Sequence, residues 1–208
     1  MLSRLVTRIT DLIDSGRLIH QMLYILLSIL VVLYFAQGVI GSLYAMFSMM
    51  SNDYFPFMIK FSSILIAVIY VVSFMVAGLL LNDRAKRFKE SQFRGLIDQW
   101  INLTRMGLEV NSILVLGYFI ATAGAVFLAG PQGFRASGIF LAWSIEWTGE
   151  AVSGIFSHDS EILSRLFSFL ILIFGVLVSW SMYYFGSFFV ELLDTADRFF
   201  KRIPHDKK

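Results

Sequence analysis

The chain of 208 residues is 57% hydrophobic and only 15% charged, and its net charge is +2. A soluble domain has about 45–50% apolar and about 25% charged residues, so this composition excludes a disordered chain and indicates a membrane protein, because a small globule would expose too much apolar surface to water. The small net charge excludes a basic nucleic-acid-binding domain, and the absence of cysteine excludes disulfide scaffolds and cysteine-ligated metal sites.

The membrane spans are indicated by four stretches that lack Asp, Glu, Lys and Arg. These stretches cover residues 18–52, 61–82, 110–134 and 166–190. A hydrocarbon core about 30 Å thick needs roughly 20 helical residues, and polar and apolar residues do not alternate as they do in a barrel strand. We therefore predict an all-α, polytopic integral membrane protein with four transmembrane helices, over residues 19–46, 58–81, 107–130 and 164–190. The first is long enough to tilt and to project beyond the lipid.

The first 18 residues precede the first span and carry apolar residues at helical spacing. Asp11 and Asp14 argue against an organellar transit peptide, and the apolar stretch that follows is too long for a cleaved signal. We expect residues 1–18 to form a cytoplasmic amphipathic helix. Such a helix would lie either on the membrane or on the central connection of the same chain.

Small residues follow one face of the first and third predicted spans. In the first span the stripe is Gln37, Gly41 and Ala45, and in the third it is Gly117, Ala121, Ala125 and Ala129. Such stripes let two helix backbones approach closely, and packing drives helix association in lipid. We predict helix packing at both stripes, against a helix of this chain or of another chain.

The central connection, residues 83–105, carries six basic residues among apolar residues at three- and four-residue spacing. We predict a cytoplasmic amphipathic segment with Trp100 as an interfacial anchor. It would bind anionic lipid or a cytoplasmic partner.

After the third span, Gly130, Pro131 and Gly133 interrupt the helix. Residues 139–156 are predicted to form an outer interfacial helix that begins after Ser137 and Gly138. Its interfacial anchors would be Trp143 and Trp147, which lie one turn apart. Glu146 and Glu150 on another edge would attract a cation or a basic partner, or would simply be solvated.

The topology follows from the basic residues. Fourteen of the 17 lie in the first 17 residues, in the central connection, or in a basic tail at residues 191–208. Because cytoplasmic loops carry an excess of Lys and Arg, we predict that both termini and the connection are cytoplasmic. The expected location is a bacterial inner (plasma) membrane.

Two short passages recur along the chain. Residues 28–31 (SILV) recur at 112–115, and Tyr34-Phe35 recurs at Tyr118-Phe119, both displaced by 84 positions, while the ends of the second and fourth spans match at a displacement of 112. This predicts an internal repeat of two-helix units related by an axis along the membrane normal. The alternative is chance similarity between apolar helices.

The residues that could carry chemistry are few. The three histidines lie in separate parts of the chain, and no metal-ligating, phosphate-binding or nucleophile motif is present in the sequence. We therefore expect no cofactor, no metal and no enzymatic activity. Glu109 follows Arg105 by four residues, so a local ion pair is available, and Glu191 closes the fourth span. Both carboxylates would mark the membrane boundary, a partner contact or an ion relay.

These features predict a non-enzymatic subunit that scaffolds or assembles a larger membrane complex, for example a bacterial secretion or conjugation apparatus. Its expected partners are the lipid bilayer and either other membrane-protein subunits or further copies of the chain. The alternative is a small oligomeric transporter or channel with Glu109, Glu191 and Gln37 near its path.

Overall fold

The computed structural model describes residues 17–90, 96–141 and 161–202, and nearly all of them are helical. In chain order the elements are α2 (Arg17–Ala36), the π-helix η1 (Gln37–Gly41), α3 (Ser42–Ser51), α4 (Phe57–Glu90), α5 (Leu96–Ala129), α6 (Gln132–Leu141) and α8 (Glu161–Arg202). Among the described residues, four helices are long and apolar enough to cross a membrane: His20–Ser51, Phe57–Glu90, Gln99–Ala129 and Arg165–Ala196. The all-helical, four-span prediction is confirmed at this level.

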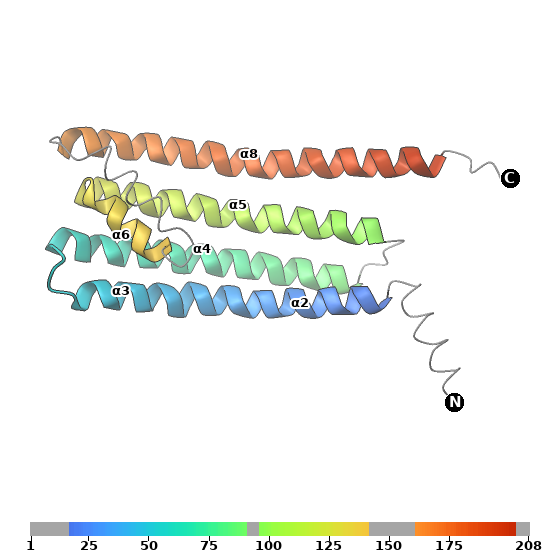
Figure 1. Cartoon of the computed structure of the whole chain (residues 1–208), viewed down its shortest axis with the longest axis horizontal. Coiled ribbons are helices and arrows are strands. Elements are labelled where there is room, and N and C mark those ends of the chain that lie inside the picture. The colour runs from blue at the N-terminus through green and yellow to red at the C-terminus, as the bar shows by residue number, and fades with distance from the viewer. Residues whose placement is uncertain (1–16, 91–95, 142–160, 203–208) are drawn as a thin grey trace, which may run out of the picture.

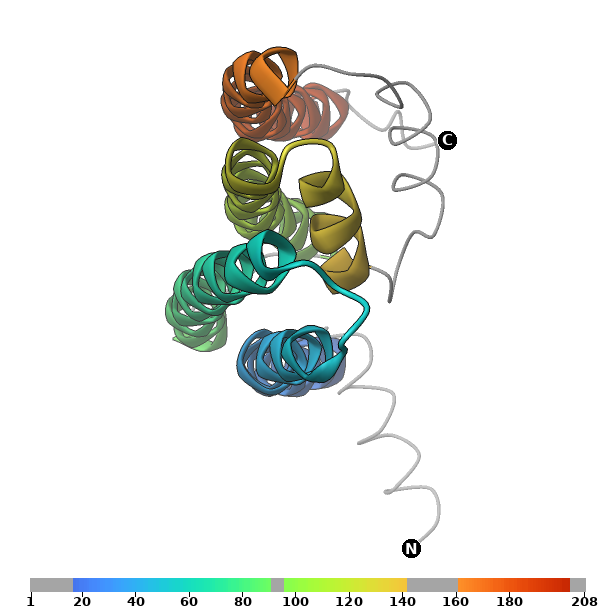
Figure 2. The same ribbon diagram turned by 90° about the vertical axis from the view of Figure 1, so that its left-hand side faces the viewer.

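The four long helices lie antiparallel in one curved row, in the order in which they occur along the chain (Figures 1 and 2). Each packs mainly on its neighbour in sequence, α2 on α4, α4 on α5, and α5 on α8. The most apolar windows of α4 and α5 are 33% and 39% buried, whereas those of the first span and α8 are 17% buried. The row is therefore open, with the first span and α8 as its two edges.

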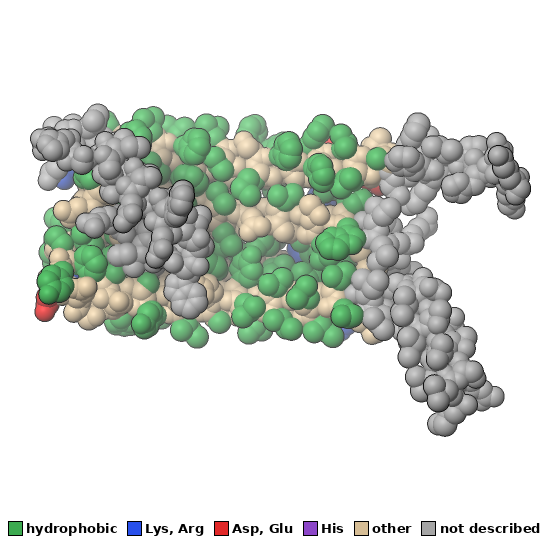
Figure 3. Space-filling model, viewed as in Figure 1, with side chains coloured by type: hydrophobic (Ala, Val, Ile, Leu, Met, Phe, Trp, Pro, Cys, Tyr) green, Lys and Arg blue, Asp and Glu red, His purple; other side chains and the backbone are tan. Residues whose placement is uncertain are grey.

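The surface of this row is apolar along its length. Hydrophobic side chains cover the face seen in Figure 3 on all four long helices, and few charged side chains appear among them. A soluble monomer rarely exposes apolar patches larger than a few hundred Å². Lipid is the solvent that fits such a surface.

The first span is one continuous helix that contains a π-turn. α2, η1 and α3 follow one another without a break, and a helix of 32 residues is about 48 Å long at 1.5 Å per residue. This exceeds a hydrocarbon core of about 30 Å, as expected for a tilted or projecting helix. A π-turn adds one residue to a helical turn, so it changes which residues face the neighbouring helix.

Glycines let the helices of the row approach each other closely. A side chain at Gly38 would contact Phe74 of α4, and the ring of Phe35 lies 3.1 Å from where a Cβ on Gly78 would be. The first span and α4 therefore each place an aromatic ring over a glycine of the other helix. On the other side of the row, Phe119 of α5 lies over Gly175 of α8 in the same way.

Three helices extend beyond the charge-free stretches, into the central connection and the tail. α4 runs on to Glu90 and α5 begins at Leu96, so most of residues 83–105 extend the two spans instead of forming a separate surface segment. α8 likewise continues to Arg202, through most of the predicted basic tail. Apolar residues at helical spacing continue beyond the charge-free stretches, and they allow the extended helices to keep packing on each other.

The chain turns back on itself after α5. Gly130 has a φ of 60°, a left-handed conformation that glycine adopts without strain. α6 then begins at Gln132 and ends at Leu141. Ser137, which was predicted to precede a helix at 139–156, therefore lies inside a helix. Residues 142–156 of the predicted helix lie outside the described residues. Ser137 and Thr122 share a hydrogen bond of 2.6 Å. α6 therefore folds back against the end of α5 that precedes Gly130 and against one face of the row (Figure 2).

Candidate functional site

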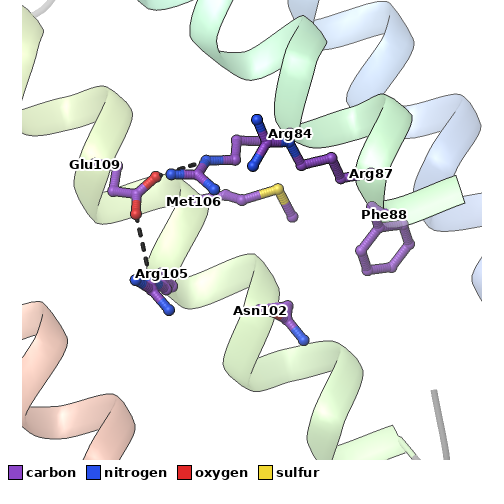
Figure 4. Close-up of a pocket in the computed structure, with 7 residues that line it drawn as sticks. All are labelled: Arg84, Arg87, Phe88, Asn102, Arg105, Met106 and Glu109. Carbon is purple, nitrogen blue, oxygen red and sulfur yellow. Dashed lines mark hydrogen bonds and ion pairs between the residues drawn. The ribbon is translucent and has the colours of Figure 1, made fainter. Parts of the chain in front are cut away.

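The candidate site lies at the basic end of the row, which we define as the end where α4 finishes and α5 begins. Glu109 of α5 is its centre, and only 7% of its side chain is exposed. Oε2 of Glu109 lies 3.0 Å from Nε of Arg84 on α4, and Oε1 lies 3.3 Å from Nε of Arg105. Two arginines from two helices therefore hold one buried carboxylate (Figure 4).

The geometry of the site follows from the packing of α4 on α5. Arg105 precedes Glu109 by one helical turn, so their pairing is local. Arg84 reaches the carboxylate because α4 and α5 pack through a cluster that includes Leu81 and Phe88 of α4 and Met106 of α5. Removing a carboxylate from water costs several kcal/mol unless opposite charges surround it. The two guanidinium groups supply these charges.

Beside this ion pair lies a cavity of about 200 Å³. Its lining residues come from α4 and α5, and they are Arg84, Arg87, Phe88, Asn102, Arg105, Met106 and Glu109. Arg87 also pairs with Asp83 of its own helix, at 3.0 Å between Nη2 and Oδ2. The cavity is therefore rich in hydrogen-bond donors, with three guanidinium groups against one carboxylate.

The start of the first span is fixed to the same end of the row. The ring of His20 stacks on Phe88, with 4.7 Å between centroids and 18° between planes. Nε2 of His20 lies 3.4 Å from the carbonyl oxygen of Lys89, and the ammonium of Lys89 lies 5.1 Å from the ring centroid of Tyr24. These contacts join α2 to the end of α4 that carries the arginines.

Of the other predicted charged or interfacial residues, those that the structure describes do not line this cavity. Glu191 is exposed on α8, and Trp100 is 64% exposed on α5. Trp143, Trp147, Glu146 and Glu150 lie outside the described residues. Among the residues that the structure describes, no group of three or more His, Cys, Asp or Glu is placed to hold a metal ion.

The structure places the small-residue stripe of the third span between α4, α5 and α6. Ala121 and Ala125 are fully buried in a cluster with Ile66 of α4, and Ala129 packs against that cluster. A side chain at Gly117 would contact Ser73 of α4.

The stripe of the first span is displaced by one residue from the predicted one. Gln37 is exposed, and Gly41 and Ala45 are half-buried, whereas Gly38 and Ser42 are buried. Gly38 and Ser42 continue the face of Leu27, Val31 and Tyr34 at three- and four-residue spacing, so the larger apolar residues earlier in the span, and not the small residues alone, mark the face that packs on α4.

Small residues on α8 form a packing face that the sequence reasoning missed. Ser168, Gly175, Ser179 and Gly186 are buried, and Oγ of Ser179 donates a hydrogen bond of 2.7 Å to the carbonyl oxygen of Ser112 on α5. Their separations of seven, four and seven residues follow a heptad pattern. This heptad spacing is visible in the sequence and could have predicted the packing face, but the many aromatic residues between these positions obscure it.

The sequence reasoning also missed Arg84 as the partner of Glu109. The two residues are 25 positions apart, and they lie on different helices, α4 and α5. Only the register of the two packed helices brings them together.

Comparison with known proteins gives no relative from which a function can be transferred. No protein-family model, no curated protein and no solved structure matches this chain.

Proposed function

We propose that this chain is a non-enzymatic integral membrane subunit that assembles with other membrane proteins or with further copies of itself. The observation that carries the proposal is the open row, in which, among the described helices, two of the four spans have one long helix beside them and the other two have two. A membrane protein that acts as a monomer gains stability when its helices close into a bundle, because packing, and not the hydrophobic effect, drives helix association in lipid. An open row leaves both edges available to neighbours.

The edge formed by α8 has a regular outward face. Large side chains lie about half a turn from the buried small residues, which places them away from α5. They are Leu170, Ile173, Leu177, Tyr184 and Phe188, and each is at least 53% exposed. A second helix packed on this face would close the row on that side.

The proposed topology has both termini on the cytoplasmic side of a bacterial inner membrane. One end of the row holds the start of α2, the end of α4, the start of α5 and the end of α8 (Figure 1). Arg84, Arg87, Arg105 and Arg198 lie toward that end, and an excess of basic residues favours the cytoplasm.

We also propose the internal repeat, in which the first and second spans form one two-helix unit and the third and fourth spans form the other. Phe35 and Phe119 correspond at the displacement of 84, and each packs on a glycine of the following span, Gly78 and Gly175 respectively. The two glycines are 97 positions apart and fit neither displacement, so the proposal rests on the matched residues of the first and third spans.

A bacterial secretion or conjugation apparatus is one complex in which such a subunit could act.

The transporter or channel alternative requires a polar path through the row, with Gln37, Glu109 and Glu191 near it. Gln37 and Glu191 are exposed on the row's edges, and Glu109 is held by two arginines at one end. The buried hydroxyls of Ser62 and Ser73 donate to carbonyl groups of their own helix. The subunit proposal therefore fits these residues better.

Site-specific photocrosslinking in native membranes tests the subunit proposal. A photoreactive phenylalanine analogue replaces Tyr184 or Phe188 on the α8 edge, and Val72 of α4 serves as the control. All three side chains are at least 54% exposed, but Val72 belongs to a helix that already has two neighbours. We expect protein crosslinks of one discrete mass from Tyr184 and Phe188, and only lipid adducts from Val72. Lipid adducts alone from all three positions would rule the proposed interface out.

A further inference from the structure

We propose that the cavity beside Glu109 binds a phosphate group, and that its depth favours the headgroup of an anionic phospholipid as the source. The first reason is charge. Arg84, Arg87 and Arg105 line the cavity together with one carboxylate. Even when Asp83, the partner of Arg87, is counted with Glu109, one positive charge is left without a counterpart.

The second reason is the supply of donors. Arg84 and Arg105 both contact Glu109 through Nε, and the hydrogen bond that reaches the carboxylate comes from Nε of Arg105, so the described hydrogen bonds to Glu109 use no terminal guanidinium nitrogen. A guanidinium carries five N–H donors and binds phosphate oxygens in pairs. Asn102 of α5 also lines the cavity (Figure 4).

The third reason is the rigidity of the arginines. A surface arginine must lose side-chain entropy to bind an anion, whereas Arg84 and Arg105 are already held by the buried Glu109. Their side chains are 32% and 53% exposed, so an anion can reach them. The carboxylate therefore positions the two arginines without neutralising both.

The fourth reason is depth in the membrane. The charge-free stretch of α4 ends at Asn82, and that of α5 begins at Val110. Arg84 and Glu109 lie directly outside these limits and contact each other, so the cavity lies where the apolar segments of both helices end. Lipid headgroups occupy this level of a bilayer. Phe88 and Met106 in the cavity lining offer apolar contact to the adjoining part of a lipid.

Native mass spectrometry of the full-length chain in detergent tests the proposal. The probes are phosphatidylglycerol, phosphatidylcholine and inorganic phosphate, and the readout is the apparent dissociation constant of the first bound molecule. We expect phosphatidylglycerol to bind at least fivefold more tightly than phosphatidylcholine, since one basic residue near a surface contributes about 1 kcal/mol. Equal affinities for the two lipids would overturn the proposal.

The variants are chosen so that affinity changes in opposite directions. Arg105→Gln and, separately, Arg87→Gln remove one donor group each, and each should weaken phosphatidylglycerol binding by about fivefold. Glu109→Gln removes the competing negative charge but keeps a side-chain oxygen that can accept the hydrogen bond from Arg105, so the arginine stays positioned and binding should become stronger. A purely structural role of the cluster would instead weaken binding in every variant, and that result would contradict the proposal.

Arg198→Gln is the matched control. Arg198 is exposed on α8 and pairs with Asp194 one turn away at 2.6 Å, and it does not line the cavity. The variant removes the same charge from the same end of the molecule, and binding should be unchanged. A loss equal to that of Arg105→Gln would show non-specific attraction only. Inorganic phosphate distinguishes a soluble phosphate ligand from a lipid headgroup. If it binds as tightly as phosphatidylglycerol, the ligand is a soluble phosphate and the lipid assignment is wrong. If it does not bind, the ligand is the lipid.

Discussion

Replacing Gly117 by leucine lowers the free energy of unfolding by about 2 kcal/mol, because the added side chain enters the contact between α4 and α5. A Cβ at this position would contact the Ser73 side chain, whose own Cβ lies 2.6 Å away. Ser73 is held in place by a hydrogen bond of 2.8 Å to the carbonyl oxygen of Ile69. The two helices must therefore move apart, and thermal unfolding in detergent would show the loss as a midpoint lower by roughly 5 °C.

Gly107→Leu is the control for this prediction. Gly107 lies on the same helix, and no atom lies within 4 Å of where its Cβ would be. Leucine is favoured over glycine in a helix by about 0.5–1 kcal/mol, so the control should match or exceed the parent chain in stability. If the two variants lose stability equally, close packing of α4 on α5 at Gly117 is refuted.

Removal of both arginines that hold Glu109 is the second large effect. The double variant Arg84→Ala/Arg105→Ala leaves a carboxylate that is 7% exposed without either ion-pair partner. Breaking a buried ion pair by removing one side typically costs about 3–5 kcal/mol. We expect about 3 kcal/mol here, because both arginines are partly exposed, and chemical unfolding of the reconstituted chain measures the loss.

A third substitution distinguishes an unpaired charge from lost packing. Adding Glu109→Gln to the double variant removes the charge and keeps the volume of the side chain, so most of the stability should return. Asp194→Ala, which breaks the exposed pair with Arg198, should cost less than about 1 kcal/mol. Failure of Glu109→Gln to recover any stability would mean that the arginines stabilise the helices through packing alone.

The number of spans was predictable because lipid imposes a strong constraint on sequence. Charge is excluded from the hydrocarbon core, so the four charge-free stretches predicted four helices, and the structure has four helices of that kind among its described residues. The ends of these helices were less predictable. Charged residues mark where the apolar core ends, but Phe88 and Met106 continue the packing of α4 on α5 beyond that point.

The candidate site was only half predictable. The local pairing of Arg105 with Glu109 follows from helical spacing, but the contact of Arg84 with Glu109 depends on how α4 is positioned along α5. In the third span the predicted small-residue stripe includes the buried residues Gly117, Ala121 and Ala125, because α5 is a regular helix there. In the first span the packed face passes through Leu27, Gly38 and Ser42, and the predicted stripe of Gln37, Gly41 and Ala45 lies one residue beside it, so the small residues alone did not identify that face.

The mass of the native particle tests the central claim, which is that this open row of helices is one part of an assembly. The tagged chain is extracted from its own membrane with a lipid-retaining polymer, and the protein mass of each particle is measured by native mass spectrometry. The account predicts particles that contain the 208-residue chain together with at least one further protein chain in a fixed ratio. Particles that contain a single copy of this chain and otherwise only lipid would contradict it.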